Sequence, residues 1–243
     1  DGEKTPSLIS ELRTRGYINE EYSREAQKLA DYYYPIEMDL NFPLKEKKKK
    51  MREWWLKHFD LLIKSGLNKG HLEKVIESGK IEFRKGVLDF LHYCYSGKIP
   101  LIIISSSGLG DESIRMFFEK HNKMYDNIFI FSNQYIWDEK GNALDVRKPI
   151  VHCMNKDESI IRDFNIYPSL RENIRRRKNV LLLGDSLEDI EMIKGFDYDA
   201  LIKIGFLNEG VEKNLEKYKQ NYDVVLLNDA DFSFVNKFMR DIK

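Results

Sequence analysis

Two carboxylates follow an aliphatic run in the second half of the chain. Residues 179–183 lead into Gly184, Asp185 and Ser186, and Asp189 stands four positions after Asp185. A short aliphatic run without polar alternation is typical of a strand buried on both faces of a parallel sheet, and such sheets bind ligands beyond the carboxyl ends of their strands. The spacing therefore predicts Asp185 as a metal ligand with Asp189 as its partner. The simpler interpretation is a helix start capped by Ser186.

A second group of polar residues also follows an aliphatic run. The sequence Ser-Ser-Gly-Leu-Gly at 106–110 comes directly after the apolar residues 100–105 and precedes a helical pattern. Hydroxyls and unobstructed N–H groups at a helix start can bind phosphate, although this segment matches neither a P-loop nor a dinucleotide fingerprint. Lys148, before Pro149, adds a cation, and a lone lysine is more often an ordinary surface residue. Serine, lysine and carboxylates at successive strand–helix junctions together form the set that holds a phosphoryl group with Mg²⁺.

The elements that must position these residues divide the chain near residue 82. Before it, apolar periodicity predicts only helices, the first ended by Pro35. After it, predicted strands and helices alternate, which indicates a doubly wound parallel α/β sheet. The predicted helices are 18–34, 44–65, 71–78, 85–95, 112–121, 156–164, 211–219 and 232–242, and the predicted strands are 100–105, 127–132, 179–183, 200–204 and 222–227.

Charge and composition exclude several kinds of partner. The 40 basic and 40 acidic residues cancel, so nothing global favours nucleic acid or an anionic membrane, and the lysine-rich run at 45–50 is expected to be a solvated helix face. Apolar runs are far shorter than the ~20 residues of a membrane span. Two cysteines make no disulfide framework and favour a reducing compartment. We therefore expect a cytoplasmic monomer without membrane or nucleic-acid partners.

The order of these motifs resembles motifs two, three and four of the haloacid dehalogenase (HAD)-like phosphatases. Six segments are more narrowly similar to the cytosolic 5′-nucleotidase III group, also called the pyrimidine 5′-nucleotidases. They are 35–39, 53–55, 106–111, 184–186, 201–208 and 222–226. The resemblance covers nearly the whole chain and implies a HAD-like Rossmannoid core with an inserted helical cap. The cap would be residues 18–82, and the core residues 1–17 and 83–243.

The resemblance implies an activity, a cofactor and a phosphate site. The family hydrolyses nucleoside 5′-monophosphates such as CMP and UMP with Mg²⁺, through an aspartyl-phosphate. Asp185 is then the metal ligand, and Asp189 supports it or pairs with the phosphate-binding lysine. Ser106 binds phosphate, helped by the N–H groups of Ser107 and Gly108.

Two of these assignments have competitors. Ser105 is an alternative to Ser106, because three serines run together. Lys148 is our choice for the phosphate lysine, and Arg147 is the alternative, since its spacing from His152 and Asn155 fits the family slightly better.

The resemblance also assigns recognition of the base to the cap. Glu37 matches a base-binding glutamate, and Trp55 a base-stacking aromatic, while Trp54 is expected to be cap core. Consecutive helix positions differ by about 100°, so the two tryptophans should face different ways. Pyrimidine-directed members often carry tyrosine at the position of Trp55, and tryptophan is similar to the branch that also accepts 7-methylguanosine monophosphate (7-methyl-GMP).

One family motif is absent from the sequence. The nucleophile motif Asp-x-Asp-x-Thr does not occur, and the two Asp-x-Asp pairs, at 197–199 and 229–231, lie far along the chain. The strand that carries this motif would lie between the strands around Leu101 and Leu181. We expect the nucleophile upstream of residue 1, and these 243 residues alone to be inactive and poorly soluble. The alternatives are a catalytically inactive nucleotide-binding module and a HAD phosphatase of another small ester.

Overall fold

The computed structural model describes residues 5–157, 170, 172, 174, 176–194 and 197–242. The chain forms two compact units. The first comprises Asp1–Glu82, Ser105–Met124 and Ser132–Asn155, and the second comprises Phe83–Ile104, Tyr125–Phe131 and Lys156–Lys243. The opening segment of the first unit ends where the cap is predicted to end, but the unit includes later segments as well. The division into cap 18–82 and core stays a prediction.

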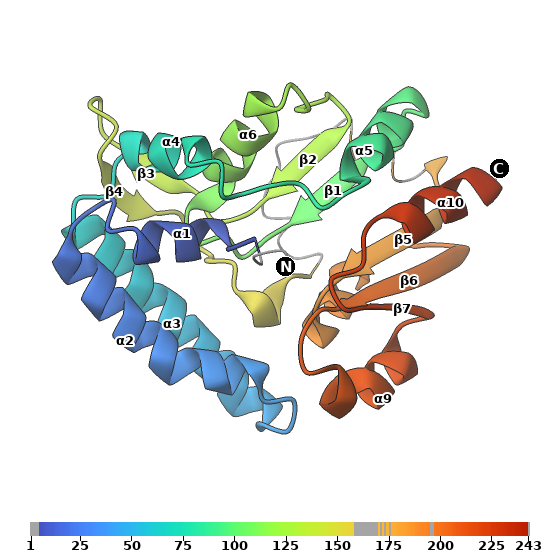
Figure 1. The fold of residues 1–243 in the computed structure, drawn as a ribbon, viewed down its shortest axis with the longest axis horizontal. Coiled ribbons are helices and arrows are strands. Elements are labelled where there is room, and N and C mark those ends of the chain that lie inside the picture. Colours follow the sequence, from blue (N-terminus) through green and yellow to red (C-terminus); the bar gives the residue numbers. More distant parts are fainter. Residues whose placement is uncertain are drawn as a thin grey trace. The chain divides into compact units, whose positions relative to one another are not determined.

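The first unit is mainly helical. Helices α2 and α3 run side by side (Figure 1), and strands β3 and β4 form a short antiparallel hairpin. Its elements are α1 (Leu8–Thr14), α2 (Glu20–Met38), α3 (Leu44–Lys64), α4 (Lys69–Glu77), α6 (Gly110–Lys120), β3 (Tyr135–Trp137), β4 (Ala143–Val146) and the 3₁₀ turn η1 (Cys153–Asn155).

The pairing of α2 with α3 follows from the spacing of their apolar residues. Helix α2 buries Tyr22, Ala26, Ala30 and Tyr33, which recur every three or four residues and so share one face. This face packs against the buried residues of α3, among them the two adjacent tryptophans. The Asn19 side chain caps α2 by accepting a 2.8 Å hydrogen bond from the Tyr22 N–H.

The prediction that Pro35 ends the helix is wrong. Helix α2 continues through Pro35 to Met38, and the Asp39 N–H donates to the Pro35 carbonyl at 3.1 Å. Proline removes one N–H, but its fixed φ suits a helix, and the Asp31 carbonyl that loses its partner belongs to an exposed residue. Tyr33, two residues earlier, is buried against Trp54. Tertiary packing therefore holds the last turn helical.

His58 of α3 is buried as a neutral imidazole beside the Tyr22 hydroxyl, 3.2 Å from Nε2. Burial, with a contribution from the Arg13 cation, lowers the pKa of His58 to about 3. In the unfolded chain, histidine has an ordinary pKa of ~6.5. Between that pH and about 3, the unfolded chain therefore binds a proton at His58 that the folded chain does not.

We expect acidification to reduce the free energy of unfolding because of His58. Between neutral pH and about pH 5.5 this residue alone should remove on the order of 1 kcal/mol, and buried His152, whose pKa is lowered to about 4, should add to the loss. Urea unfolding of the wild type and His58→Gln at several pH values measures this. The variant should show a shallower pH dependence than the wild type, whereas the exposed control His92→Gln should not. Equal slopes for wild type and His58→Gln would contradict the expectation.

The second unit contains the parallel strands. Strands β1 and β2 form one parallel pair, and β5, β6 and β7 form a three-stranded parallel sheet in that order. Among the described strands, β1 and β5 each have a single neighbour. The elements are α5 (Val87–Ser96), β1 (Leu101–Ile104), β2 (Ile128–Phe131), β5 (Asn179–Gly184), the 3₁₀ helix η2 (Leu187–Ile193), β6 (Ala200–Leu207), α9 (Val211–Asn221), β7 (Val224–Leu227) and α10 (Ser233–Asp241).

The predicted alternation of parallel strands with helices is confirmed. Two details differ from the prediction. Strand β6 continues to Leu207, because its last residues pair with β7, and the element after β5 is a 3₁₀ helix. The helix predicted at 156–164 lies almost entirely outside the described residues.

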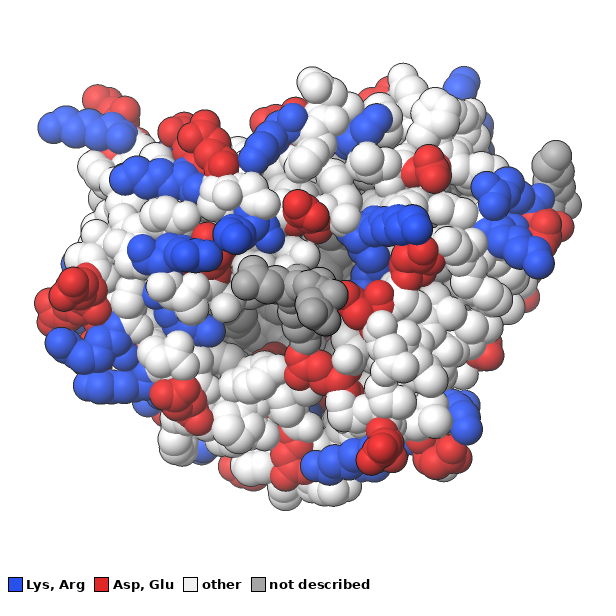
Figure 2. Space-filling view, in the orientation of Figure 1, with Lys and Arg blue, Asp and Glu red and all other residues white. Residues whose placement is uncertain are grey.

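The visible face in Figure 2 carries basic and acidic side chains interspersed over its surface, as the zero net charge leads one to expect. In the described part of the chain, no helix combines the length and the apolarity needed to cross a membrane. Cys94 and Cys153 are both buried and form no disulfide.

Candidate active site

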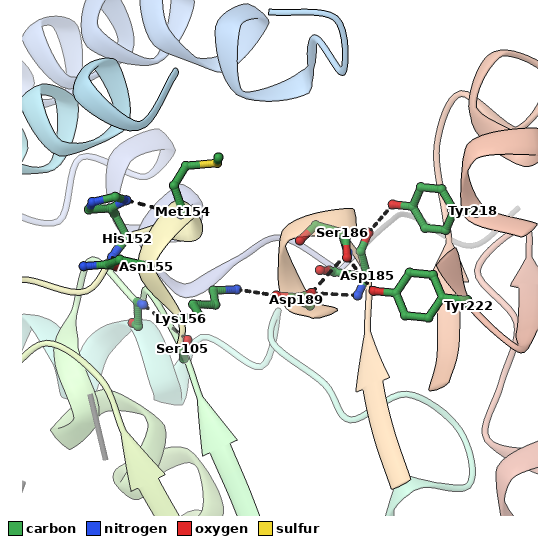
Figure 3. A network of polar contacts seen from close by, with 11 residues as sticks. Ser105, His152, Met154, Asn155, Lys156, Asp185, Ser186, Asp189, Tyr218 and Tyr222 are labelled. Atoms are coloured by element: carbon green, nitrogen blue, oxygen red, sulfur yellow. Dashed lines mark hydrogen bonds and ion pairs between the residues drawn. The ribbon is translucent and has the colours of Figure 1, made fainter. Parts of the chain in front are cut away.

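Asp185 is the first residue after β5, and its backbone is held on both sides (Figure 3). Its N–H donates to Asp189 Oδ2 at 2.9 Å, and its carbonyl accepts a hydrogen bond from the Tyr218 hydroxyl at 2.6 Å. The N–H of Ser186 also donates to Asp189 Oδ2, at 3.1 Å. The Asp189 carboxylate therefore satisfies the N–H groups that precede η2 and fixes the turn that carries Asp185.

The other oxygen of Asp189 is paired with a lysine. Lys156 Nζ lies 2.9 Å from Asp189 Oδ1, and the two side chains are only 14% and 4% exposed. Burial opposes ionisation of Asp189, but the Lys156 ammonium and the N–H groups of Asp185 and Ser186 outweigh it, so the pKa of Asp189 is lowered. Asp189 is thus an ionised anchor with both oxygens engaged.

Asp185 is in the opposite position. Asp185 is exposed, yet partial desolvation by the surrounding protein and the neighbouring Asp189 carboxylate raise the pKa of its carboxyl group. A cation placed beside it would relieve this repulsion. Among the described residues, no group of three or more His, Cys, Asp or Glu side chains is arranged to hold a metal. Mg²⁺ takes one or two carboxylates together with water and substrate phosphates, so Asp185 fits as one protein ligand of such an ion.

The lysine that pairs with Asp189 is Lys156. The assignment of Lys148 as the phosphate-binding lysine, with Arg147 as its alternative, stays a prediction. Lys148 and Arg147 are both exposed. Lys156, the partially buried cation beside Asp189, is the first residue of the helix predicted at 156–164.

A tight turn lies immediately before Lys156. The His152 N–H donates to Asn155 Oδ1 at 2.7 Å, and Asn155 Nδ2 donates to the Ile150 carbonyl at 2.9 Å. These bonds close the 3₁₀ turn η1 and end it directly at Lys156. The turn closed by His152 and Asn155 therefore fixes the backbone from which Lys156 extends.

In the predicted phosphate loop, two of the three serines shape the backbone. Ser105 Oγ accepts from the Ser107 N–H, and Ser107 Oγ accepts from the Leu109 N–H, each at 3.2 Å. No side-chain hydrogen bond of Ser106 is found within the described residues. The arrangement favours Ser106 over Ser105 as the phosphate-binding hydroxyl, and this assignment stays a prediction.

Gly108 brings the same loop against Trp55. A Cβ atom on Gly108 would lie 2.8 Å from Trp55 Cζ3, a distance that real side chains do not adopt, so the loop packs here only because it has glycine. The predicted phosphate loop and the predicted base-stacking residue are therefore in contact. This contact lies wholly within the first unit.

The surroundings of Trp55 constrain how it can act. The residue is 9% exposed and stacks on Trp54 and Phe59, with ring centroids 5.8 and 5.5 Å away. Trp54 is core as expected, but its ring lies only 13° from parallel to that of Trp55, so the two do not simply face different ways. Stacking of a base on Trp55 stays a prediction and requires its aromatic neighbours to make room. Glu37, half-buried in the last turn of α2, is likewise untested as a base-binding residue.

Comparison with known proteins places this chain. The family model described as pyrimidine 5′-nucleotidase (UMPH-1) matches residues 1–243. A 7-methylguanosine phosphate-specific 5′-nucleotidase from Xenopus laevis is 32% identical over 241 residues, which are 99% of this chain and 81% of that protein. The 7-methylguanosine phosphate-specific 5′-nucleotidase of Homo sapiens is 32% identical over 243 residues, which are 100% of this chain and 79% of that protein.

Solved structures show the same fold. A cytosolic 5′-nucleotidase IIIB bound to cytidine superposes with a TM-score of 0.81 at 24% identity, covering 99% of this chain and 78% of that one. A substrate-bound phosphoserine phosphatase superposes with a TM-score of 0.58 at 19% identity, covering 96% and 90%. The fold is that of the HAD-like hydrolases. Within that class, the chain belongs to the pyrimidine 5′-nucleotidase (UMPH-1) family.

Proposed function

We propose that this protein hydrolyses nucleoside 5′-monophosphates to nucleoside and phosphate in the cytoplasm, as a Mg²⁺-dependent monomer acting through an aspartyl-phosphate. The observation that carries the proposal is the Lys156–Asp189 ion pair beside Asp185 at the carboxyl end of β5, in a chain of the pyrimidine 5′-nucleotidase family. A cation, a buried carboxylate anchor and an outward carboxylate form the set needed to hold a phosphoryl group.

Each group has a role in this proposal. The Lys156 ammonium neutralises phosphate oxygens, and its ion pair with Asp189 holds it in place. The Ser106 hydroxyl and the N–H groups of Ser107 and Gly108 donate to the phosphate. Asp185 holds Mg²⁺, which when bound offsets charge on the phosphoryl group. The nucleophile is an aspartate of the family's first motif, which these 243 residues do not contain.

Two substrate classes follow from the family and the cap. The family is named for pyrimidine nucleotides, and the relatives described above are named for 7-methylguanosine phosphate. We propose that 7-methyl-GMP is accepted alongside CMP and UMP, because a methylated, cationic purine interacts well with the indole of Trp55.

The test is phosphate release from CMP, UMP, 7-methyl-GMP and AMP, with Mg²⁺ and with EDTA. It is run on these 243 residues and on the full-length product of the gene. Metal-dependent turnover of the pyrimidine or methylguanosine substrates by the full-length product supports the proposal. Turnover by the 243 residues alone would contradict the expectation that hydrolysis needs the Asp-x-Asp-x-Thr motif. Binding of CMP or 7-methyl-GMP without hydrolysis by either chain would indicate a nucleotide-binding module.

Recognition of the base by Glu37 predicts a selective defect. In Glu37→Gln, KM for nucleotides should rise about tenfold, since hydrogen bonds to a charged group contribute ~1.5–3 kcal/mol. Hydrolysis of p-nitrophenyl phosphate, which has no base, should not change. Steady-state kinetics on both substrates measure this, with Asp31→Asn, an exposed carboxylate on the same helix, as the control. An equal loss on both substrates would mean that Glu37 supports the fold rather than the base.

A further inference from the structure

Two tyrosine hydroxyls bind the backbone of the turn that carries Asp185. The hydroxyl of Tyr218, on α9, donates to the Asp185 carbonyl at 2.6 Å, and the hydroxyl of Tyr222, just after α9, donates to the Ser186 carbonyl (Figure 3). The rings are 6% and 3% exposed and lie 5.6 Å apart, at 25° to each other. Both residues belong to the same compact unit as Asp185.

Paired glycines on neighbouring strands make room for Tyr222. Gly184 at the end of β5 and Gly205 on β6 are register partners. A Cβ on Gly184 would lie 2.6 Å from the Tyr222 Oη, and a Cβ on Gly205 would lie 2.6 Å from its Cδ2. The phenol ring thus covers two adjacent strands where neither has a side chain, which lets its hydroxyl reach the first turn beyond β5.

The two hydroxyls complete the fixation of the Asp185 backbone. The Asp189 carboxylate accepts a hydrogen bond from the Asp185 N–H, and the Tyr218 hydroxyl donates one to the Asp185 carbonyl. Both tyrosine hydroxyls act as donors in these bonds, because the atoms they meet are carbonyl oxygens. With both peptide groups flanking its Cα engaged, the backbone of Asp185 is fixed, and with it the direction in which the side chain leaves the chain.

We propose that Tyr218 and Tyr222 are positioning residues for the metal-binding carboxylate of Asp185. This inference rests on the proposed function, because it assumes that Asp185 binds Mg²⁺. Neither tyrosine touches the reacting atoms. Their effect is transmitted through the backbone of residues 185 and 186, and Mg²⁺ is sensitive to it because the ion demands near-ideal octahedral geometry.

The test compares Tyr218→Phe, Tyr222→Phe and the double variant with Tyr93→Phe in the full-length chain. Tyr93 is a matched control, since its hydroxyl also donates to a backbone carbonyl, that of Met239, at 2.7 Å and away from this turn. Two quantities are measured: amide hydrogen exchange of the peptide spanning 183–190 without metal, and the Kd of Mg²⁺ by titration calorimetry.

We expect at least tenfold faster exchange of the 185–187 amides in the double variant, and a five- to twentyfold weaker Mg²⁺ affinity. Tyr93→Phe should lose a similar amount of global stability while both quantities stay at wild-type values. Wild-type exchange and wild-type Mg²⁺ affinity in the double variant would overturn the inference.

Failure of the proposed function is distinguishable from failure of the positioning role. If the wild type binds no Mg²⁺ and hydrolyses no nucleotide, the function and the metal role are overturned together. If the wild type binds Mg²⁺ and the double variant binds it equally well despite faster exchange, the function stands and the positioning role falls.

Discussion

Lys156→Met is expected to lower kcat/KM for nucleotides by about a hundred- to a thousandfold, since a preorganised group of this kind contributes ~2.7–4 kcal/mol to transition-state stabilisation. The change removes the cation that neutralises the phosphate and leaves Asp189 buried without its counter-ion. Loss of one member of a buried pair is itself destabilising. Steady-state kinetics and urea unfolding measure the two effects separately.

Lys148→Met is the matched control for this experiment. Lys148 is exposed, so the kcat/KM of Lys148→Met should stay within about twofold of the wild-type value. A large loss in Lys148→Met together with a small one in Lys156→Met would return the phosphate-binding role to Lys148.

Asp185→Asn should strongly reduce activity without destabilising the protein. We expect kcat/KM to fall at least a hundredfold and the Kd of Mg²⁺ to rise at least tenfold, because the neutral amide is a poor ligand for a hard cation. The pKa of Asp185 is raised, which means that its charged form is disfavoured in the folded state. Removing that charge should therefore leave the free energy of unfolding unchanged or increase it.

Calorimetric titration with Mg²⁺, kinetics and urea unfolding measure these three quantities. Asp197→Asn, a change at a highly exposed carboxylate, is the control and should alter none of them. A marked loss of stability in Asp185→Asn would show that the carboxylate supports the fold, and unchanged Mg²⁺ affinity would exclude it as the metal ligand.

Features determined by local pattern were predictable. The aliphatic run of β5 has no polar alternation and the glycine that follows it permits a sharp exit, so both the strand and the position of Asp185 at its end follow from the sequence. The α2–α3 pair follows in the same way from the spacing of apolar residues. The helix was predicted to end at Pro35 because proline disfavours the helical conformation of the residue before it. That local preference is weaker than the burial of Tyr33, which keeps this part of α2 helical.

Features that depend on contacts between residues far apart in the sequence were not predictable. Lys156 is distinguished from the exposed lysines around it only by Asp189, 33 positions away in the chain. Tyr218 and Tyr222 read as ordinary apolar positions of a helix and a strand start, and only the fold brings their hydroxyls to the carbonyls beyond β5. Periodicity shows which side of an element is buried, but not which polar atom lies opposite.

The aromatic stack in α3 makes the two units spectroscopically distinct. All three tryptophans of the protein, Trp54, Trp55 and Trp137, belong to the first unit, and none belongs to the second. Tryptophan fluorescence therefore reports on the first unit, while far-ultraviolet circular dichroism reports on both units. Superimposable unfolding curves from the two probes would mean that the units unfold as one cooperative structure, and separated curves would mean that each melts independently.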